Sequence, residues 1–209
     1  MTIAHETVLR QSHEEPHSLE YSTSGGRLKI LGFWMFLATD LVLFGCLFAT
    51  YLVVRTHAAT GPTEGQLFDV PTFTAETLIL LTSSFTCGLG TREMRRGSRG
   101  GAVSLLIITV LLGLSFVGLE VNEFVKYTSS GANVQTSAFL SAFFVLVGTH
   151  GCHVSMGILW MTSILLQLMV KGISQVTAPK VFVVGLYWHF LDVVWVYIYT
   201  VVYLMGVIK

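Results

Sequence analysis

The chain has 209 residues, of which 53% are hydrophobic and 11% are charged, and its mean hydropathy is +0.70. A soluble domain carries about 25% charged residues, so most of this surface must face something other than water. The net charge is zero, which excludes the strongly basic surface of a nucleic-acid-binding protein. Cys46, Cys87 and Cys152 lie in apolar runs and form no C-x-x-C pair. We therefore expect buried thiols rather than zinc ligands or a covalent haem attachment.

Five apolar stretches are long enough to cross a bilayer, whose hydrocarbon core of about 30 Å takes about 20 helical residues. The fourth is the longest and should tilt or project beyond the bilayer. A polar tail precedes them, over residues 1–29. The sequence thus predicts an all-α membrane domain over residues 30–208, a bundle of five transmembrane helices. We expect these helices at about residues 30–54, 72–90, 102–127, 138–170 and 181–208.

The second stretch is interrupted by hydroxyl side chains, at Thr82, Ser83, Ser84 and Thr86. Hydroxyl groups in membrane helices commonly bond across helix interfaces. This face of the second helix should therefore touch other helices rather than lipid.

Lysines and arginines are distributed unevenly between the ends of the predicted helices. Nine lie in the tail and in the loops after the second and fourth stretches, whereas three lie at the opposite ends. The basic side of a membrane protein is usually cytoplasmic. We therefore predict a cytoplasmic N-terminus and an external C-terminus. The arginines between residues 92 and 99 are the densest part of this signal.

Ionisable side chains occur inside four of the predicted helices. A charge at the bilayer centre costs at least about 2.5 kcal/mol, so such residues usually face a protein interior and find partners there. Six of them form three i, i+3 pairs, and the members of each pair lie on one helix face. Counted from the helix ends, the two glutamates lie near the outer surface and the others near mid-depth. The residues are Asp40, Glu120, Glu123, His150, His153, His189 and Asp192.

Four interpretations of these residues are open at this point. They could form a polar network that fixes helix register, or a proton relay through Asp40 or Glu120. A dinuclear metal site would normally use Glu-x-x-His motifs, which this chain lacks. A b-type haem could be held between His150 or His153 and His189. Glu76, near the start of the second helix, is predicted to be an interfacial charge near the positive helix N-terminus.

Several longer strings carry a resemblance to a known family. The fourth and fifth helices read SAFFVLVGTHGCHVSMG and LYWHFLDVVWVYIYTVVYLMG, and the first and third contain GFWMFLATDLVLFGCLFATY and SFVGLEVNEF. Over about residues 28–207 the chain resembles subunit III of the haem-copper terminal oxidases, in the form that lacks two N-terminal helices. The string LLTSSFTCGLGTREMRRGS is most similar to the form found in bacterial aa3-type (menaquinol) quinol oxidases.

The resemblance implies an accessory subunit of a proton-pumping complex that reduces O2 in the bacterial cytoplasmic membrane. Such a subunit has no catalytic, cofactor-binding or metal-binding residue of its own, stabilises subunit I and supports its proton uptake. The haems and copper are then expected in subunit I, with subunits I, II and IV and membrane lipids as partners and no nucleic acid. Asp40 matches the family's buried, carbodiimide-reactive glutamate, and the seven ionisable residues become a buried polar, proton-related network. The alternatives are subunit III of a cytochrome c oxidase, a cytochrome b-like membrane electron carrier and a proton-coupled transporter.

Overall fold

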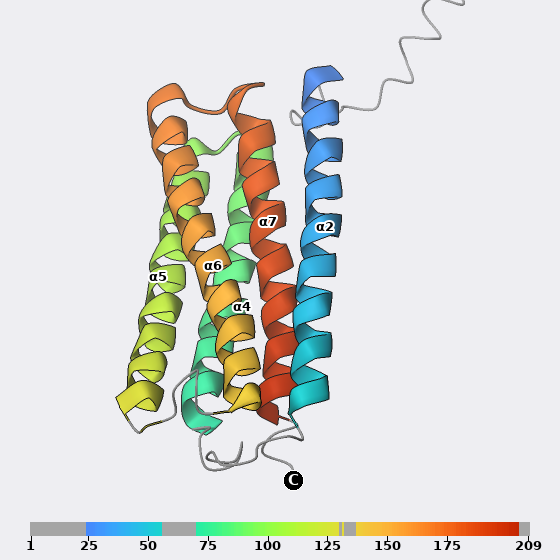
Figure 1. Ribbon diagram of the computed structural model, residues 1–209. Helices are drawn as coiled ribbons and strands as arrows, with labels where there is room; N and C mark the ends of the chain where they lie inside the picture. Colours follow the sequence, from blue (N-terminus) through green and yellow to red (C-terminus); the bar gives the residue numbers. More distant parts are fainter. Residues whose placement is uncertain (1–23, 56–69, 130, 132–136, 205–209) are drawn as a thin grey trace, which may run out of the picture.

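The computed structural model describes residues 24–55, 70–129, 131 and 137–204, and the regular secondary structure in these ranges is helical throughout. The α7 helix continues directly into a π-helical turn, η2, at its C-terminal end. Figure 1 shows the helices running side by side, each antiparallel to the next along the chain. Their bounds are α2 Ser24–Val54, α4 Val70–Arg95, α5 Arg99–Ser129, α6 Ala138–Lys171, α7 Thr177–Ile198 and η2 Tyr199–Leu204.

The helices lie where the sequence predicts them but extend further at several ends. The α2 helix begins at Ser24 rather than residue 30, and α4 ends at Arg95 rather than residue 90. A helix satisfies its own backbone hydrogen bonds, so it can continue past the hydrocarbon through polar residues such as Arg27. Residues 1–23 of the predicted tail and residues 205–208 of the predicted fifth helix lie outside the described residues.

Four of the described helices, α2, α5, α6 and α7 with η2, are long and apolar enough to cross a membrane. The α4 helix has 26 residues and is therefore about 39 Å long, but it is rich in threonine and serine. The α4 helix is therefore long enough to span the bilayer, but it is less apolar than the other four helices.

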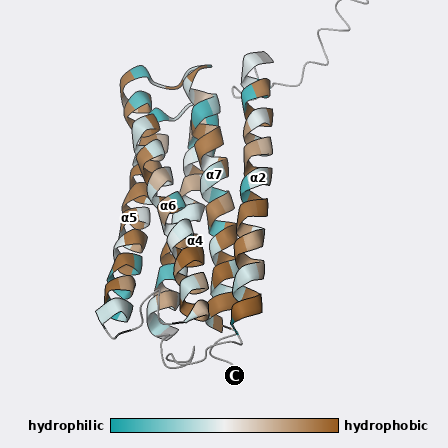
Figure 2. Cartoon of the chain, viewed as in Figure 1, coloured by the Kyte–Doolittle hydropathy of each residue, from teal (hydrophilic) through white to brown (hydrophobic). Residues whose placement is uncertain are grey.

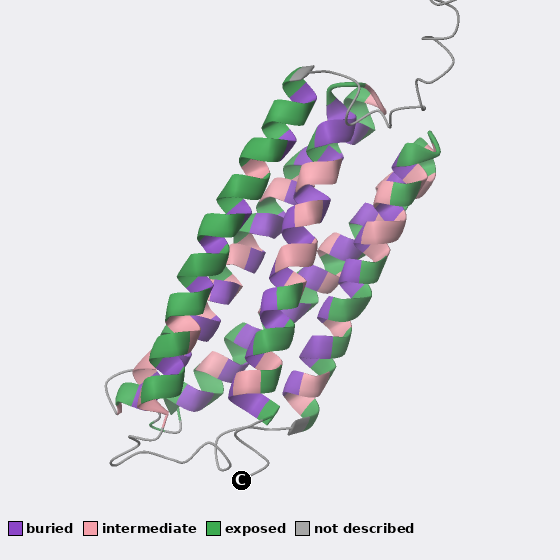
Figure 3. Ribbon diagram, turned by 90° about the vertical axis from the view of Figure 1, so that its right-hand side faces the viewer, coloured by how far each residue is buried: buried purple, intermediate pink, exposed green. Residues whose placement is uncertain are grey.

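The helices α4, α5, α6 and α7 form a closed ring in which each contacts the next, and α2 packs outside this ring against α6 and α7 (Figure 1). Large apolar side chains are also exposed, among them Leu41, Phe85 and Leu159. Figure 2 shows hydrophobic residues along the helices of the bundle. Figure 3 shows buried and exposed residues alternating around each helix. Extensive exposed apolar surface is abnormal for a soluble monomer and normal for a chain in lipid.

Two of the three cysteines contradict the prediction that all are buried. Cys87 is buried, but Cys46 and Cys152 are exposed on the outward faces of α2 and α6. The prediction was wrong for these two because both faces of a membrane helix are apolar, so an apolar run does not identify the buried face.

Two glycines form the turns at one end of the bundle. Gly97, between α4 and α5, has φ +78°, and Gly172, after α6, has φ +69°. Glycine adopts this left-handed region without the steric cost of a side chain. The guanidinium of Arg99 donates to the carbonyl of Met169, which ties the start of α5 to the end of α6.

Trp188 of α7 packs against three neighbouring helices at the centre of the ring. Its indole NH donates to Ser83 Oγ of α4 over 3.1 Å. A Cβ atom at Gly113 of α5 would lie 2.8 Å from the Trp188 ring, and one at Gly157 of α6 would lie 3.2 Å from it. Small residues at these positions allow α5 and α6 to approach the bulky side chain.

Candidate functional site

Asp40 and His153 form a contact between α2 and α6 inside the bundle. Asp40 is 6% exposed, and its Oδ1 lies 3.3 Å from His153 Nε2. The other histidine nitrogen, Nδ1, lies 2.7 Å from the carbonyl of Thr149. Asp40 Oδ2 is buried and has no hydrogen-bond partner among the described residues. The sequence-predicted carboxylate on α2 is therefore placed against one of the two predicted histidines on α6.

The hydrogen-bond geometry limits where protons can lie in this pair. Because a carbonyl oxygen only accepts, His153 Nδ1 must donate to Thr149 and therefore carries a proton. The contact between Nε2 and Asp40 then needs one further proton, carried either by the imidazole or by the carboxyl group. Asp40 and His153 can thus hold one proton in two alternative positions.

His150 lies on the same helix but faces different neighbours. It is fully buried, and its Nε2 donates to the carbonyl of Leu191 on α7 over 3.2 Å. Its ring lies 5.1 Å from the Trp195 ring and 5.9 Å from the Phe116 ring, centroid to centroid. The two histidines of the G-T-H-G-C-H motif therefore connect α6 to two different helices.

His189 and Asp192 of α7 lie against α4. His189 Nδ1 is 2.7 Å from Ser84 Oγ, and a Cβ atom at Gly88 would lie 3.7 Å from the His189 ring. Asp192 interacts with Ser84 and His189, and its Oδ1 finds no hydrogen-bond partner in the described part of the chain. The predicted i, i+3 pair is therefore bridged by a serine on the neighbouring helix.

Three buried glutamates form a third polar cluster, near the end of the bundle where α4 begins. Glu120 and Glu123 of α5 are each 4% exposed, and Glu123 Oε2 accepts from the hydroxyl of Tyr127 over 3.2 Å. Glu76 of α4 interacts electrostatically with both, and Tyr203 of η2 also lies within electrostatic range. The cluster therefore lies where α4 meets α5 and the π-helical turn.

The location of Glu76 contradicts its prediction as an interfacial charge. It is fully buried, and neither carboxyl oxygen has a hydrogen-bond partner within the described ranges. The α4 helix begins at Val70, which places Glu76 nearly two turns inside it. The sequence signal that could have identified it is the run of hydroxyl residues that follows, since it marks this helix as one that packs inside the protein.

Hydroxyl groups of α4 bond to other helices, as the interrupted apolar pattern predicts. Thr86 bonds to Thr109 of α5 over 2.8 Å, and Thr77 accepts from the indole NH of Trp195 over 3.1 Å. Thr82 is the exception among the predicted residues, because it is exposed and bonds to the Leu78 carbonyl of its own helix.

The positions of these side chains limit which of them could bind a metal ion or haem iron. Among residues 24–55, 70–129, 131 and 137–204, no group of three or more His, Cys, Asp and Glu side chains has the geometry to hold a metal ion. Both nitrogens of His153 are engaged by Asp40 and Thr149, so this imidazole cannot ligate haem iron in the observed arrangement.

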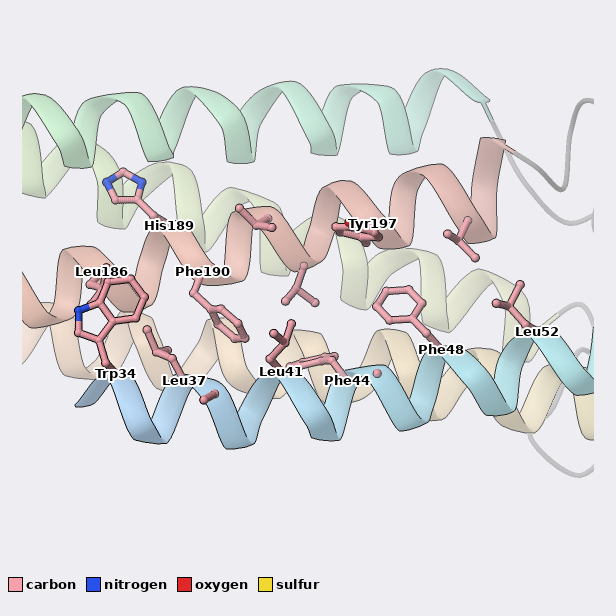
Figure 4. A pocket seen from close by; sticks show the side chains of 15 residues that line it. Trp34, Leu37, Leu41, Phe44, Phe48, Leu52, Leu186, His189, Phe190 and Tyr197 are labelled. Carbon is pink, nitrogen blue, oxygen red and sulfur yellow. The ribbon is translucent and has the colours of Figure 1, made fainter. Parts of the chain in front are cut away.

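A groove lies between α2 and α7 (Figure 4). Its volume is about 760 Å³, and aromatic side chains line it, including Trp34, Phe48 and Tyr197. His189 lies near one end of the groove. The groove is apolar elsewhere, so it suits hydrocarbon better than a polar ligand.

These features define an integral membrane protein of several helices, whose buried ionisable side chains are mostly directed at other helices. Comparison with known proteins identifies its family. Residues 20–207 match the family model described as cytochrome c oxidase subunit III. The chain belongs to this family.

Several relatives are similar along almost their whole length. Quinol oxidase subunit 3 of Bacillus subtilis (strain 168) is 55% identical over 188 residues, which cover 90% of this chain and 92% of the relative. Probable quinol oxidase subunit 3 of Staphylococcus aureus (strain USA300) is 45% identical over 94% of this chain and 98% of its own. Cytochrome bo(3) ubiquinol oxidase subunit 3 of Pseudomonas aeruginosa is 43% identical over 95% of both chains. The chain is thus a multi-pass plasma-membrane subunit of a respiratory oxidase, with other oxidase subunits as its partners.

Proposed function

We propose that this chain is the non-catalytic third subunit of a haem-copper oxidase that oxidises quinol, reduces O2 and pumps protons. The observation that carries the proposal is the 55% identity to the Bacillus subtilis quinol oxidase subunit 3 over 188 residues. The two further relatives described above are also named as quinol or ubiquinol oxidase subunits. The haems and copper then belong to subunit I, and the partners are subunits I, II and IV.

The proposed role of the chain is to stabilise subunit I and to support proton uptake. Interhelical polar contacts support the stabilising role, because they fix how the helices of this subunit pack. The Asp40–His153 pair supports the proton-related role, because it can hold one proton in two positions within the membrane. The other buried ionisable residues contribute to helix register.

We also propose that all five helices cross the membrane, with the N-terminus in the cytoplasm and the C-terminus outside. The length of α4, about 39 Å, exceeds the hydrocarbon thickness of about 30 Å. Its hydroxyl groups bond to α5 and α7, so its polarity does not require contact with water. An odd number of crossings also agrees with the uneven distribution of Lys and Arg.

Co-purification tests the proposed function. The chain, tagged and expressed in its native host, should bring down subunits I, II and IV with haem and copper, and this complex should consume oxygen with quinol as the electron donor. A purified complex that contains the chain but consumes no oxygen with quinol would contradict the proposal.

Subunit III of a cytochrome c oxidase is the second candidate, because the matching family model has that description. The electron donor binds elsewhere in such a complex, so the co-purified subunit II distinguishes the two. A Cys/His copper site in subunit II, together with oxygen consumption driven by reduced cytochrome c, would support this candidate.

A further inference from the structure

A second groove lies between α5 and α6. Its volume is about 460 Å³, and it is lined on α5 by Val117, Glu120 and Val121. Met156 and Leu159 on α6 lie beside it and are 65% and 68% exposed. The groove therefore opens on an outward face of the bundle and is not covered by the other described helices.

Four small residues, together with Met156 and Leu159, form the α6 wall of this α5/α6 groove. Gly148, Gly151, Cys152 and Ser155 line it and are spaced i, i+3, i+4 and i+7, which places them on one face of the helix. Small residues at such spacing allow a second membrane helix to approach closely. A Cβ atom at Gly148 would meet only Phe124, at 3.6 Å, so no close contact within the subunit explains this glycine.

A carboxyl group lies in the same groove. Glu120 is 4% exposed, and its Oε1 is buried without a hydrogen-bond partner among the residues described. The carboxyl group lies directly against the backbone of α6, since a Cβ atom at Gly151 would be 2.6 Å from one of its oxygens. An unpaired polar group in hydrocarbon costs several kcal/mol, so a donor from outside the subunit would be strongly favoured here.

We propose that the α5/α6 groove receives a transmembrane helix of another oxidase subunit, and that this helix carries a hydrogen-bond donor side chain opposite Glu120. Both independent features of the groove fit this occupant. The row of small residues accommodates a helix backbone, and the donor satisfies the carboxyl group. A lipid acyl chain would fill the space but offers no donor, so it explains only the first feature.

Photo-crosslinking of the purified complex tests the inference. Met156→p-benzoylphenylalanine places a reactive group at the edge of the groove, and illumination should link it to one transmembrane segment of a co-purified subunit. Peptide mass spectrometry should locate a donor side chain on the groove-facing side of that segment. Adducts with lipid or detergent alone, or a segment without such a donor, would overturn the inference. Ala49→p-benzoylphenylalanine, on exposed α2 surface, is the matched control and should not react with the same segment.

Four further variants in the Met156→p-benzoylphenylalanine background separate packing from hydrogen bonding. Gly148→Leu fills the groove at a position where a Cβ atom has room, and should reduce the adduct several-fold, whereas Ala49→Leu should not. Glu120→Gln keeps an acceptor and should retain the adduct, whereas Glu120→Leu should reduce it. An unchanged adduct in Gly148→Leu would overturn the inference even if Glu120→Leu fails to assemble.

The inference rests on the proposed function, because it requires a multi-subunit oxidase. Quinol-driven oxygen consumption is therefore measured on the same sample before illumination. If the oxidase is active but no protein adduct forms, only the proposal for the α5/α6 groove is contradicted. If the adduct forms in a complex without quinol oxidase activity, only the proposed function is contradicted.

Discussion

Asp40 is the residue at which packing and proton chemistry can be separated by mutation. Asp40→Asn keeps the size of the side chain and supplies an amide N–H that can donate to His153 Nε2, but it cannot hold the shared proton. We expect the variant to assemble and to begin turnover at nearly the wild-type rate. Its activity should then decline several-fold sooner, as measured by oxygen consumption of the purified complex during prolonged turnover.

Asp40→Glu is the control, because it restores the proton-holding group with one additional methylene. It should sustain turnover for longer than Asp40→Asn. An Asn variant that lasts as long as the wild type would leave Asp40 with a packing role only.

The Asp192 carboxyl group should contribute to the attachment of α7 to α4. Asp192→Ala removes its interactions with Ser84 and His189, which we expect to destabilise the subunit by about 1–3 kcal/mol. The measurement is the half-time for loss of this subunit from the complex in detergent, which should fall. Asp192→Asn keeps an acceptor for the serine hydroxyl, so its half-time should lie between those of Asp192→Ala and the wild type. Equal half-times for Ala and wild type would show that the contact contributes nothing to assembly.

At the scale of the helices, Trp188 sets how closely α5, α6 and α7 can pack. Gly113→Ala places a methyl group 2.8 Å from the Trp188 ring, which is held in place by its hydrogen bond to Ser83. The ring must shift or α5 must move away, and overpacking of this kind costs about 1–3 kcal/mol. The temperature at which the complex loses this subunit should therefore fall.

Gly118→Ala on the same helix is the matched control, because nothing lies within 4 Å of a Cβ atom at Gly118. Alanine also favours the helix by roughly 0.5–1 kcal/mol over glycine. The temperature of subunit loss should stay the same or rise slightly. Equal losses in both variants would mean that the effect comes from glycine replacement in α5 rather than from Trp188.

The helices were predictable from the sequence, but the partners of their polar residues were not. Apolar runs of about 20 residues are a strong local signal, and all five helices occur at the predicted places. The spacing of His150 and His153 correctly places them on one side of α6, yet residues three apart still differ in direction by about 60° around the axis. One of them therefore reaches Leu191 on α7, and the other reaches Asp40 on α2.

Glu76 shows the same limit. Its electrostatic neighbours include Glu123 of α5 and Tyr203 of the π-helical turn, and both are distant in the sequence. A local pattern specifies which residues share a helix face. It does not specify which neighbouring helix that face meets, because this depends on how the whole bundle packs.

For the whole molecule, the distribution of charge along the bundle predicts its orientation in the membrane. Eight of the ten described Lys and Arg residues lie at the end where α2 begins and α4 ends, and the other two, Arg55 and Lys126, lie at the opposite end (Figure 1). At the first end, Arg99 donates to the Met169 carbonyl and Arg95 lies over the Phe182 ring at 5.6 Å. The arginines there therefore have structural contacts in addition to any effect on topology.

Accessibility of single cysteines tests this orientation and the crossing of α4 together. In a chain whose native cysteines are replaced by alanine, cysteine is introduced at Lys29, Arg96 or Ser129, which are all exposed at helix ends. With five crossings and a cytoplasmic N-terminus, a membrane-impermeant maleimide should label Ser129→Cys in intact cells, and Lys29→Cys and Arg96→Cys only after permeabilisation. If α4 does not cross, Arg96→Cys is labelled in intact cells and Ser129→Cys is protected. If the whole bundle is inverted, Lys29→Cys is labelled as well, so each arrangement gives a different pattern.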